Sequence, residues 1–242
     1  MRLATPQEVR ASIAPHVLGG GGCRMVGANN LHPHQSEAVR RLGTIMRGSG
    51  GALLADEVGL GKTFVALALA ADFGRPTIVA PASLRRMWRD ASARAAVDTR
   101  FISMERLGHG GTIPPADFII VDEAHHFRNA HTCRYGQLAE ACVRSVVLLL
   151  TATPVQNSLR DLRTLLRLIL GKQADVLDET ALGKLIVRRS ASAIASTAAL
   201  PVIAEPEWVT VAGDADCLDQ ILQLPPPVPP SDSGQAGALA VF

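Results

Sequence analysis

The segment from Ala52 to Ala71 constrains the fold most, because it predicts a strand, a tight turn and a helix in direct succession. The apolar run ALLA leads into DEVGLGKT, and the helical pattern KTFVALALAA follows. A short continuous apolar run of this kind is typical of a strand buried on both faces. Similar runs alternate with helical patterns up to about Ile169, which predicts an α/β, three-layer fold with a mostly parallel sheet.

Further elements are expected from the same reasoning. Strand candidates follow at TIVA (77–80), RFIS (100–103), FIIV (118–121) and VVLLL (146–150), and helices are expected over 83–95 and 158–170. In the second helix, Ser158 and Asp161 form a capping pattern and Gly171 stands at the expected stop. The predicted apolar face of this helix consists of Leu162, Leu165, Leu166 and Ile169.

The turn after the first strand has the chemistry of a phosphate-binding loop. Gly59 and Gly61 allow the backbone N–H groups to approach an anion, and the following helix presents its N-terminus to it. Lys62 supplies a positive charge for the β- and γ-phosphates, and the hydroxyl of Thr63 can bind Mg²⁺. The generic pattern requires glycine at position 56, where this chain has Asp56.

A pair of carboxylates, Asp122 and Glu123, follows the apolar run FIIV. At the carboxyl end of a buried strand, the first acidic residue is suited to holding Mg²⁺. The second can act as general base for a water that attacks the γ-phosphorus. His125 is better suited to hydrogen bonding near the γ-phosphate than to metal binding, and we interpret His126 as an ordinary surface or packing residue.

Composition narrows the function classes only slightly. A net charge of +2 does not mark a strongly basic nucleic-acid binder, so that role depends on local clusters. Cys23, Cys133, Cys142 and Cys217 fit no zinc spacing, which predicts separate reduced thiols. With neither a secretory signal nor an apolar run of membrane-spanning length in sight, we expect a cytoplasmic protein without a membrane partner.

The motifs together resemble those of superfamily 2 helicase-like ATPases of the DEAD/DEAH type, and within them the Swi2/Snf2 group. DEVGLGKT is similar to that group's motif I, whose first residue is not glycine, and VDEAHH is similar to motif II. Five other segments resemble family blocks in the expected order: LHPHQSEAVRRL (31–42), APASLRRMWRD (80–90), ISMERL (102–107), LTATPVQNSLRDL (150–162) and, weakly, LIVRRSAS (185–192).

The resemblance implies a first RecA-like lobe that binds ATP and Mg²⁺. The implied nucleotide-binding residues are Gln35 at the adenine and Asp56, Glu57, Gly59, Leu60, Gly61, Lys62 and Thr63 in the loop. Lys62, Asp122 and Glu123 would be catalytic, with Thr63 and Asp122 at the metal.

The resemblance also implies a nucleic-acid partner, expected to be double-stranded DNA. Ser83, Arg85 and Ser103 would lie near its phosphates, whereas His125, Thr151, Thr153 and Gln156 would couple the γ-phosphate state to lobe movement. From the residues alone, the cluster Arg85, Arg86 and Arg89 equally fits a solvated basic helix face, and Trp88 is expected to pack in the core.

The expected organisation has three parts: a flexible lead-in over 1–30, the ATP-binding lobe over 31–190, and a linker or truncated tail over 191–242. The tail contains a Pro/Gly/Ser-rich stretch at 224–237 and matches none of the second-lobe motifs. Arginine fingers from such a lobe accelerate hydrolysis by roughly 10³–10⁵ in GTPases. Weak or absent turnover is therefore expected of this chain unless a second chain supplies the lobe.

Three alternatives to a DNA-dependent ATPase remain open at this point. The chain could be a nucleotide-responsive subunit that works only with a partner. It could also be a truncated or decayed fragment without autonomous activity. Finally, it could be the motor part of a restriction or phage-defence system, which uses the same motifs.

Overall fold

The computed structural model describes residues 25–26, 29–152, 159–190 and 194. The chain divides into two compact units, Met1–Leu200 and Pro201–Phe242, and all described residues belong to the first. Most of the predicted lead-in, nearly all of the predicted tail and the motif residues Thr153, Gln156 and Asn157 lie outside the described residues, as do Cys23 and Cys217.

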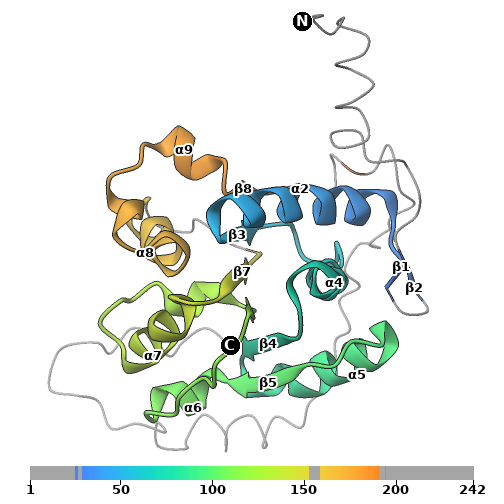
Figure 1. The fold of residues 1–242 in the computed structure, drawn as a ribbon, viewed down its shortest axis with the longest axis horizontal. Coiled ribbons are helices and arrows are strands. Elements are labelled where there is room, and N and C mark those ends of the chain that lie inside the picture. The colour runs from blue at the N-terminus through green and yellow to red at the C-terminus, as the bar shows by residue number, and fades with distance from the viewer. Residues whose placement is uncertain (1–24, 27–28, 153–158, 191–193, 195–242) are drawn as a thin grey trace, which may run out of the picture. The chain divides into compact units, whose positions relative to one another are not determined.

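Helices and strands alternate along the described part of the chain (Figure 1). The strands are β1 (Met25–Val26), β2 (Asn29–Asn30), β3 (Gly51–Leu54), β4 (Pro76–Ala80), β5 (Arg100–Ser103), β6 (Phe118–Val121), β7 (Val146–Leu150) and β8 (Ile186–Val187). The α-helices are α2 (Pro33–Ser49), α3 (Lys62–Ala68), α4 (Ala70–Phe73), α5 (Arg85–Ala95), α6 (Met104–Gly108), α7 (Cys133–Cys142), α8 (Leu159–Leu170) and α9 (Glu179–Gly183). Short 3₁₀ turns are η1 (Ala82–Leu84), η2 (Ala124–Phe127) and η3 (Gly171–Asp175).

The central sheet has six strands in the order β5-β4-β6-β7-β3-β8, and every neighbouring pair is parallel. Strands β1 and β2 form a separate antiparallel pair. Because all central strands run the same way, the loops after β3, β4, β5 and β6 emerge at one edge of the sheet. Ligands of open parallel sheets bind at this carboxyl edge.

Helices cover both faces of the sheet, and a separate hydrophobic core lies on each face. Successive residues of a strand point to opposite faces and therefore enter different cores. In β6, Phe118 and Ile120 pack with α2, α3 and α5, whereas Ile119 and Val121 pack with α6, α7 and α8. Figure 1 shows α6, α7 and α8 on the opposite side of the sheet from α5. The predicted three-layer α/β fold with a parallel sheet is confirmed, and burial on both faces explains the continuous apolar runs.

Several local predictions need correction. The helix expected over 62–71 is divided at Leu69 into α3 and α4. In α8, Leu168 is buried and Ile169 only half-buried, so the apolar face is shifted from the predicted one. Strand β8 was not predicted, because two residues beside a basic segment carry too little periodicity for recognition.

Candidate nucleotide site

The loop between β3 and α3 takes a shape that requires two glycines. Gly59 and Gly61 have φ angles of 86° and 77°, a region that favours glycine. A Cβ on Gly61 would also lie 2.2 Å from Nε2 of Gln35. The loop therefore turns tightly enough to direct its backbone N–H groups and the N-terminus of α3 toward one point, as phosphate binding requires.

Lys62 and Thr63 open helix α3 directly after this turn. The Lys62 ammonium donates to the carbonyl oxygens of Asp56 at 2.7 Å and Glu57 at 3.1 Å. It therefore connects the end of the loop to the first two residues of the loop. Burial lowers the pKa of Lys62, while the charges of Asp56, Asp122 and Glu123 act in the opposite direction. The two motifs are thus close enough in space to share an electrostatic environment.

Gln35 lies beneath the loop at the first turn of α2. Its Nε2 donates to the carbonyl of Leu60 at 3.3 Å, and its Oε1 accepts from the backbone N–H of His32 at 3.0 Å. The side chain is almost fully buried. Gln35 therefore connects the helix expected at the adenine to the phosphate loop.

The side chain of Asp56 is paired within the protein. Its carboxylate is fully buried and forms an ion pair with Arg189, which follows strand β8. Asp56 therefore contributes to the site by anchoring the loop through its ion pair with Arg189. Sequence reasoning missed Arg189, although a basic segment near the end of the lobe was a usable signal.

The carboxylate pair lies at the carboxyl end of β6. Asp122 is buried. Its Oδ2 accepts a hydrogen bond from the indole N–H of Trp88, and its Oδ1 accepts one from the backbone N–H of Glu123, both at 2.9 Å. Burial raises the pKa of Asp122, and the hydrogen bond from Trp88 opposes that rise. Trp88 is buried as expected, but its hydrogen bond to the predicted metal ligand is a structural finding.

Glu123 adopts a left-handed backbone with φ 48°, which non-glycine residues rarely do. Such conformations cluster at functional sites because the surrounding structure must hold them. Nδ1 of His125 lies 3.1 Å from Oε2 of Glu123, although the pair does not form an aligned hydrogen bond. The predicted base and the predicted γ-phosphate contact are thus neighbours.

The two oxygen ligands proposed for Mg²⁺, Thr63 and Asp122, come from these two motifs. Within the described ranges, no group of three His, Cys, Asp or Glu side chains is arranged to hold a metal ion. An Mg²⁺ with few protein ligands and phosphate oxygens for the remainder fits this arrangement. Asp122 keeps carboxylate lone pairs beyond its two hydrogen bonds, so the residues fit the group.

The candidate nucleic-acid residues lie at or just after the carboxyl ends of two neighbouring strands, β4 and β5. Ala80 and Ser103 are paired in the register of β4 and β5, and Ser83 and Arg85 follow β4. Ser103 caps α6 by accepting from the N–H of Arg106 at 3.4 Å, and the Arg85 guanidinium lies 4.5 Å from the Phe101 ring centre. These side chains therefore have internal roles besides any contact with phosphate.

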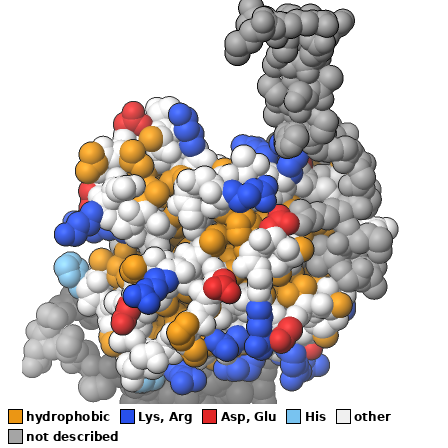
Figure 2. Space-filling model, in the orientation of Figure 1, with side chains coloured by type: hydrophobic (Ala, Val, Ile, Leu, Met, Phe, Trp, Pro, Cys, Tyr) orange, Lys and Arg blue, Asp and Glu red, His pale blue; other side chains and the backbone are white. Residues whose placement is uncertain are grey.

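Basic side chains gather over α5 and β5 in Figure 2, with acidic ones between them. Arg86 and Arg89 both lie near Asp90, at 3.8 and 3.5 Å, so part of the positive charge on α5 is balanced. The basic face of α5 therefore still fits both interpretations, a solvated helix face and a phosphate-binding face, and the contact with nucleic acid stays a prediction.

The predicted coupling segment is described only at its beginning. Thr151 is fully buried after β7, and its N–H donates to the carbonyl of Leu54 at 3.1 Å. It therefore links the end of β7 to the strand that precedes the phosphate loop. Thr153 and Gln156 lie outside the described residues.

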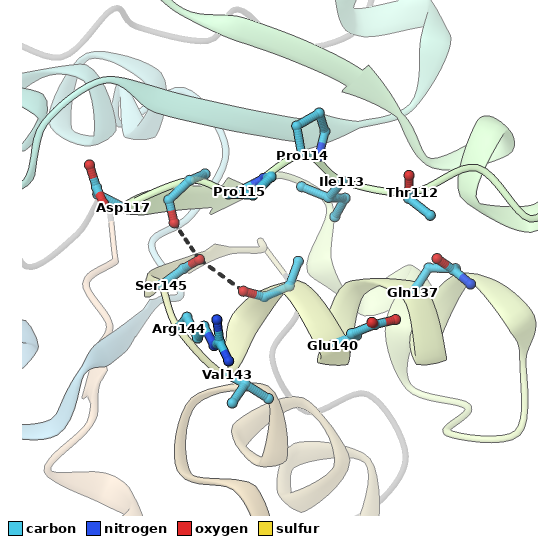
Figure 3. Close-up of a pocket in the computed structure, with 12 residues that line it drawn as sticks. Thr112, Ile113, Pro114, Pro115, Asp117, Gln137, Glu140, Val143, Arg144 and Ser145 are labelled. Atoms are coloured by element: carbon cyan, nitrogen blue, oxygen red, sulfur yellow. Dashed lines mark hydrogen bonds between the residues drawn. The ribbon is translucent and has the colours of Figure 1, made fainter.

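Other features lie apart from this edge. A pocket of about 770 Å³ is lined by residues 112–117 before β6 and by the end of α7, at the amino edge of the sheet (Figure 3). There the Ser145 hydroxyl donates to the carbonyls of Ala116 and Ala141.

Cys133 and Cys142 are free thiols at the two ends of α7, and burial raises the pKa of Cys142 to about 12. No helix among the described residues is long and apolar enough to cross a membrane.

Comparison with known proteins agrees with the motifs. The model of the SNF2-related domain family matches residues 104–184. An uncharacterized ATP-dependent helicase, YqhH, of Bacillus subtilis is 30% identical over 163 residues, covering 57% of this chain and 29% of the relative. DNA repair and recombination protein RAD54B of Gallus gallus is 30% identical over 187 residues, covering 59% of this chain and 20% of the relative.

Solved structures show the same fold. The Sulfolobus solfataricus SWI2/SNF2 ATPase core in complex with dsDNA matches with a TM-score of 0.55 at 19% identity, covering 69% of this chain and 46% of that one. The ATPase core domain from the same organism matches with a TM-score of 0.54 at 20% identity, covering 72% of this chain and 46% of that one.

This chain thus spans less than half the length of each of these relatives. The seven ordered motifs, the family model, the curated relatives and the fold all agree with one another. Residues 104–184 match the SNF2-related domain, and the described residues resemble the first RecA-like lobe of Swi2/Snf2-type helicase-like ATPases.

Proposed function

We propose that this chain supplies the ATP·Mg-binding lobe of a DNA-dependent ATPase that uses hydrolysis to move on nucleic acid. The observation that carries the proposal is the meeting of the phosphate loop and the Asp122–Glu123 pair at one edge of the sheet. The relatives support the ATP-hydrolysing class, since those compared include an ATP-dependent helicase and SWI2/SNF2 ATPase cores.

In this proposal each residue has a defined task. The loop N–H groups and Lys62 bind the phosphates, and Thr63 and Asp122 hold Mg²⁺, which would neutralise charge on the β- and γ-phosphates. The Glu123 carboxylate accepts a proton from the water that attacks the γ-phosphorus, while the bond to the leaving β-phosphate oxygen breaks. His125 is close enough to Glu123 to influence its orientation.

Nucleic acid is proposed to lie along the loops after β4 and β5. A relative's core was solved in complex with dsDNA, which supports the choice of duplex DNA as the first substrate to test. Ser83, Arg85 and Ser103 are the proposed phosphate contacts. Because the lobe matches 46% of that core, we propose that movement requires the remaining part, from the same polypeptide or from a second chain.

The test is nucleotide binding and steady-state ATP turnover by the purified chain, with and without duplex DNA. ATP binding that requires Mg²⁺ is the expected result, and DNA-stimulated turnover would mean that the chain is a working motor core. Binding without turnover would favour a nucleotide-responsive lobe that needs a partner. Failure to bind ATP at millimolar concentration would refute the proposal.

A further inference from the structure

One guanidinium, that of Arg189, joins three segments that are distant in sequence. Its Nε donates to Oδ1 of Asp56 at 3.2 Å, and its Nη2 donates to Oδ2 of the same carboxylate. Its Nη1 donates to the backbone carbonyl of His34, in the first turn of α2. The phosphate loop, the helix that carries Gln35 and the segment after β8 therefore meet at one side chain.

The backbone continues the same connection. Leu53 and Ala55 donate to the carbonyls of Leu185 and Val187 at 2.9 and 2.8 Å, as expected for neighbouring parallel strands. The ladder then continues into the phosphate loop, where the N–H of Glu57 donates to the carbonyl of Arg189 at 3.1 Å. The first residues of the loop are therefore held by strand β8 and its extension.

The ion pair is largely excluded from solvent. The exposed fractions of the Arg189 and Asp56 side chains are 12% and 1%. A buried charge that loses its partner is strongly destabilising, and a bidentate Arg–carboxylate pair also sets orientation. The pair therefore determines where the Asp56 backbone lies, and the carbonyl of Asp56 accepts from Lys62.

We propose that Arg189 is a positioning residue for the phosphate loop. The generic loop has glycine at position 56, whereas here the buried Asp56 carboxylate is held by Arg189. Loop geometry, and through it the position of Lys62, then depends on residues that follow the last strand of the lobe. This inference rests on the proposed nucleotide-binding function.

The test measures the affinities for ATP and for AMP of the full chain and of four variants. The variants are Arg189→Lys, Arg189→Met, Asp56→Asn and the double variant Asp56→Asn/Arg189→Met. Titrations are made well below each variant's melting temperature. Arg188→Met is the matched control, because Arg188 is the adjacent residue and is exposed. A partial loss of folded protein lowers the affinity for both nucleotides equally, whereas a displaced phosphate loop lowers that for ATP selectively.

We expect Arg189→Met to weaken ATP binding roughly tenfold or more, the scale typical of groups that support a binding residue from behind. The affinity of Arg189→Met for AMP should change much less. Arg189→Lys should have an intermediate ATP affinity, because lysine keeps the charge but lacks the bidentate geometry of the guanidinium. Arg188→Met should bind ATP as the unaltered chain does. The double variant should be no weaker than Arg189→Met, because the two residues act as one unit.

An unchanged ratio of ATP to AMP affinity in Arg189→Met would overturn the inference, as would additive losses in the double variant. These results differ from failure of the proposed function, in which the unaltered chain itself would not bind ATP.

Discussion

The phosphate loop and the candidate nucleic-acid surface lie at the same edge of the sheet, yet they are built differently. Around the loop, Gln35, Asp56 and Asp122 are buried and their side-chain oxygens accept hydrogen bonds from the protein. On the surface after β4, Ser83 and Arg85 are exposed. The side chains of the candidate nucleotide site are therefore held by tertiary contacts, whereas Ser83 and Arg85 are exposed to solvent.

This difference predicts unequal sensitivity to substitution. Single changes near the loop should disturb a network in which each group positions the next. Single changes on the basic surface should remove one contact among several, each screened by salt.

Glu123→Gln should have the largest effect, on turnover alone. Removing a general base reduces the rate by about 10²–10⁴, whereas the amide keeps the shape of the side chain and leaves ATP binding intact. Steady-state turnover and ATP affinity are measured on the same preparation, with Glu140→Gln, an exposed carboxylate at the amino edge, as control. Unchanged turnover would show that Glu123 is not the base.

Lys62→Ala should remove ATP binding at micromolar concentrations. The ammonium lies across the loop, and losing charge-assisted hydrogen bonds to phosphate should weaken binding on the order of 100-fold. Lys172→Ala, at an exposed lysine in η3, is the control for a change of charge. Micromolar ATP affinity retained by Lys62→Ala would refute the assignment of the phosphate loop.

Trp88→Phe should raise the Mg²⁺ concentration needed for ATP binding. The indole N–H orients the Asp122 carboxylate, and losing such a supporting group typically costs roughly 10-fold in metal affinity. The measurement is ATP affinity across a Mg²⁺ titration.

Tyr135→Phe is the matched control for Trp88→Phe, because it removes a buried donor whose partner, the carbonyl of Thr164, lies outside the site. Trp88→Phe should lose more stability in thermal unfolding than Tyr135→Phe, because it also reduces the volume of a fully buried side chain. Only Trp88→Phe should change the Mg²⁺ dependence. Equal Mg²⁺ dependence in both would show that Trp88 acts in packing alone.

Arg85→Ala should have the smallest effect. If Arg85 contacts one DNA phosphate, its loss should lower the slope of log affinity against log salt by about 0.9 and leave ATP affinity unchanged. Duplex DNA binding is measured over a range of salt concentrations, with Arg94→Ala at the other end of α5 as control. An unaltered slope would favour the solvated helix face over the phosphate contact.

Much of the fold could be predicted from local pattern. The strands β5, β6 and β7 have the predicted boundaries. In β6 and β7 the boundaries are clear because uninterrupted apolar runs stand between polar turns, whereas β5 is an edge strand in which only Ile102 is buried. Strand β8 and the break at Leu69 could not be predicted. A two-residue strand leaves no periodic signal, and the apolar pattern over 62–71 runs through Leu69 without interruption. The roles of Thr153 and Gln156 stay predictions.

The candidate site divides in the same way. Local sequence pattern was enough to predict the strand–turn–helix unit that carries Gly59, Gly61 and Lys62, and the carboxylate pair that follows a buried strand. The reason is that an apolar run, a glycine turn and a helical pattern in direct succession are all local signals. The phosphate-binding role of the loop stays a prediction. The pairing of Asp56 with Arg189 and the hydrogen bond from Trp88 to Asp122 became visible only in the folded chain, because these partners are 133 and 34 positions apart. Such pairs depend on the order of parallel strands, which local spacing does not encode.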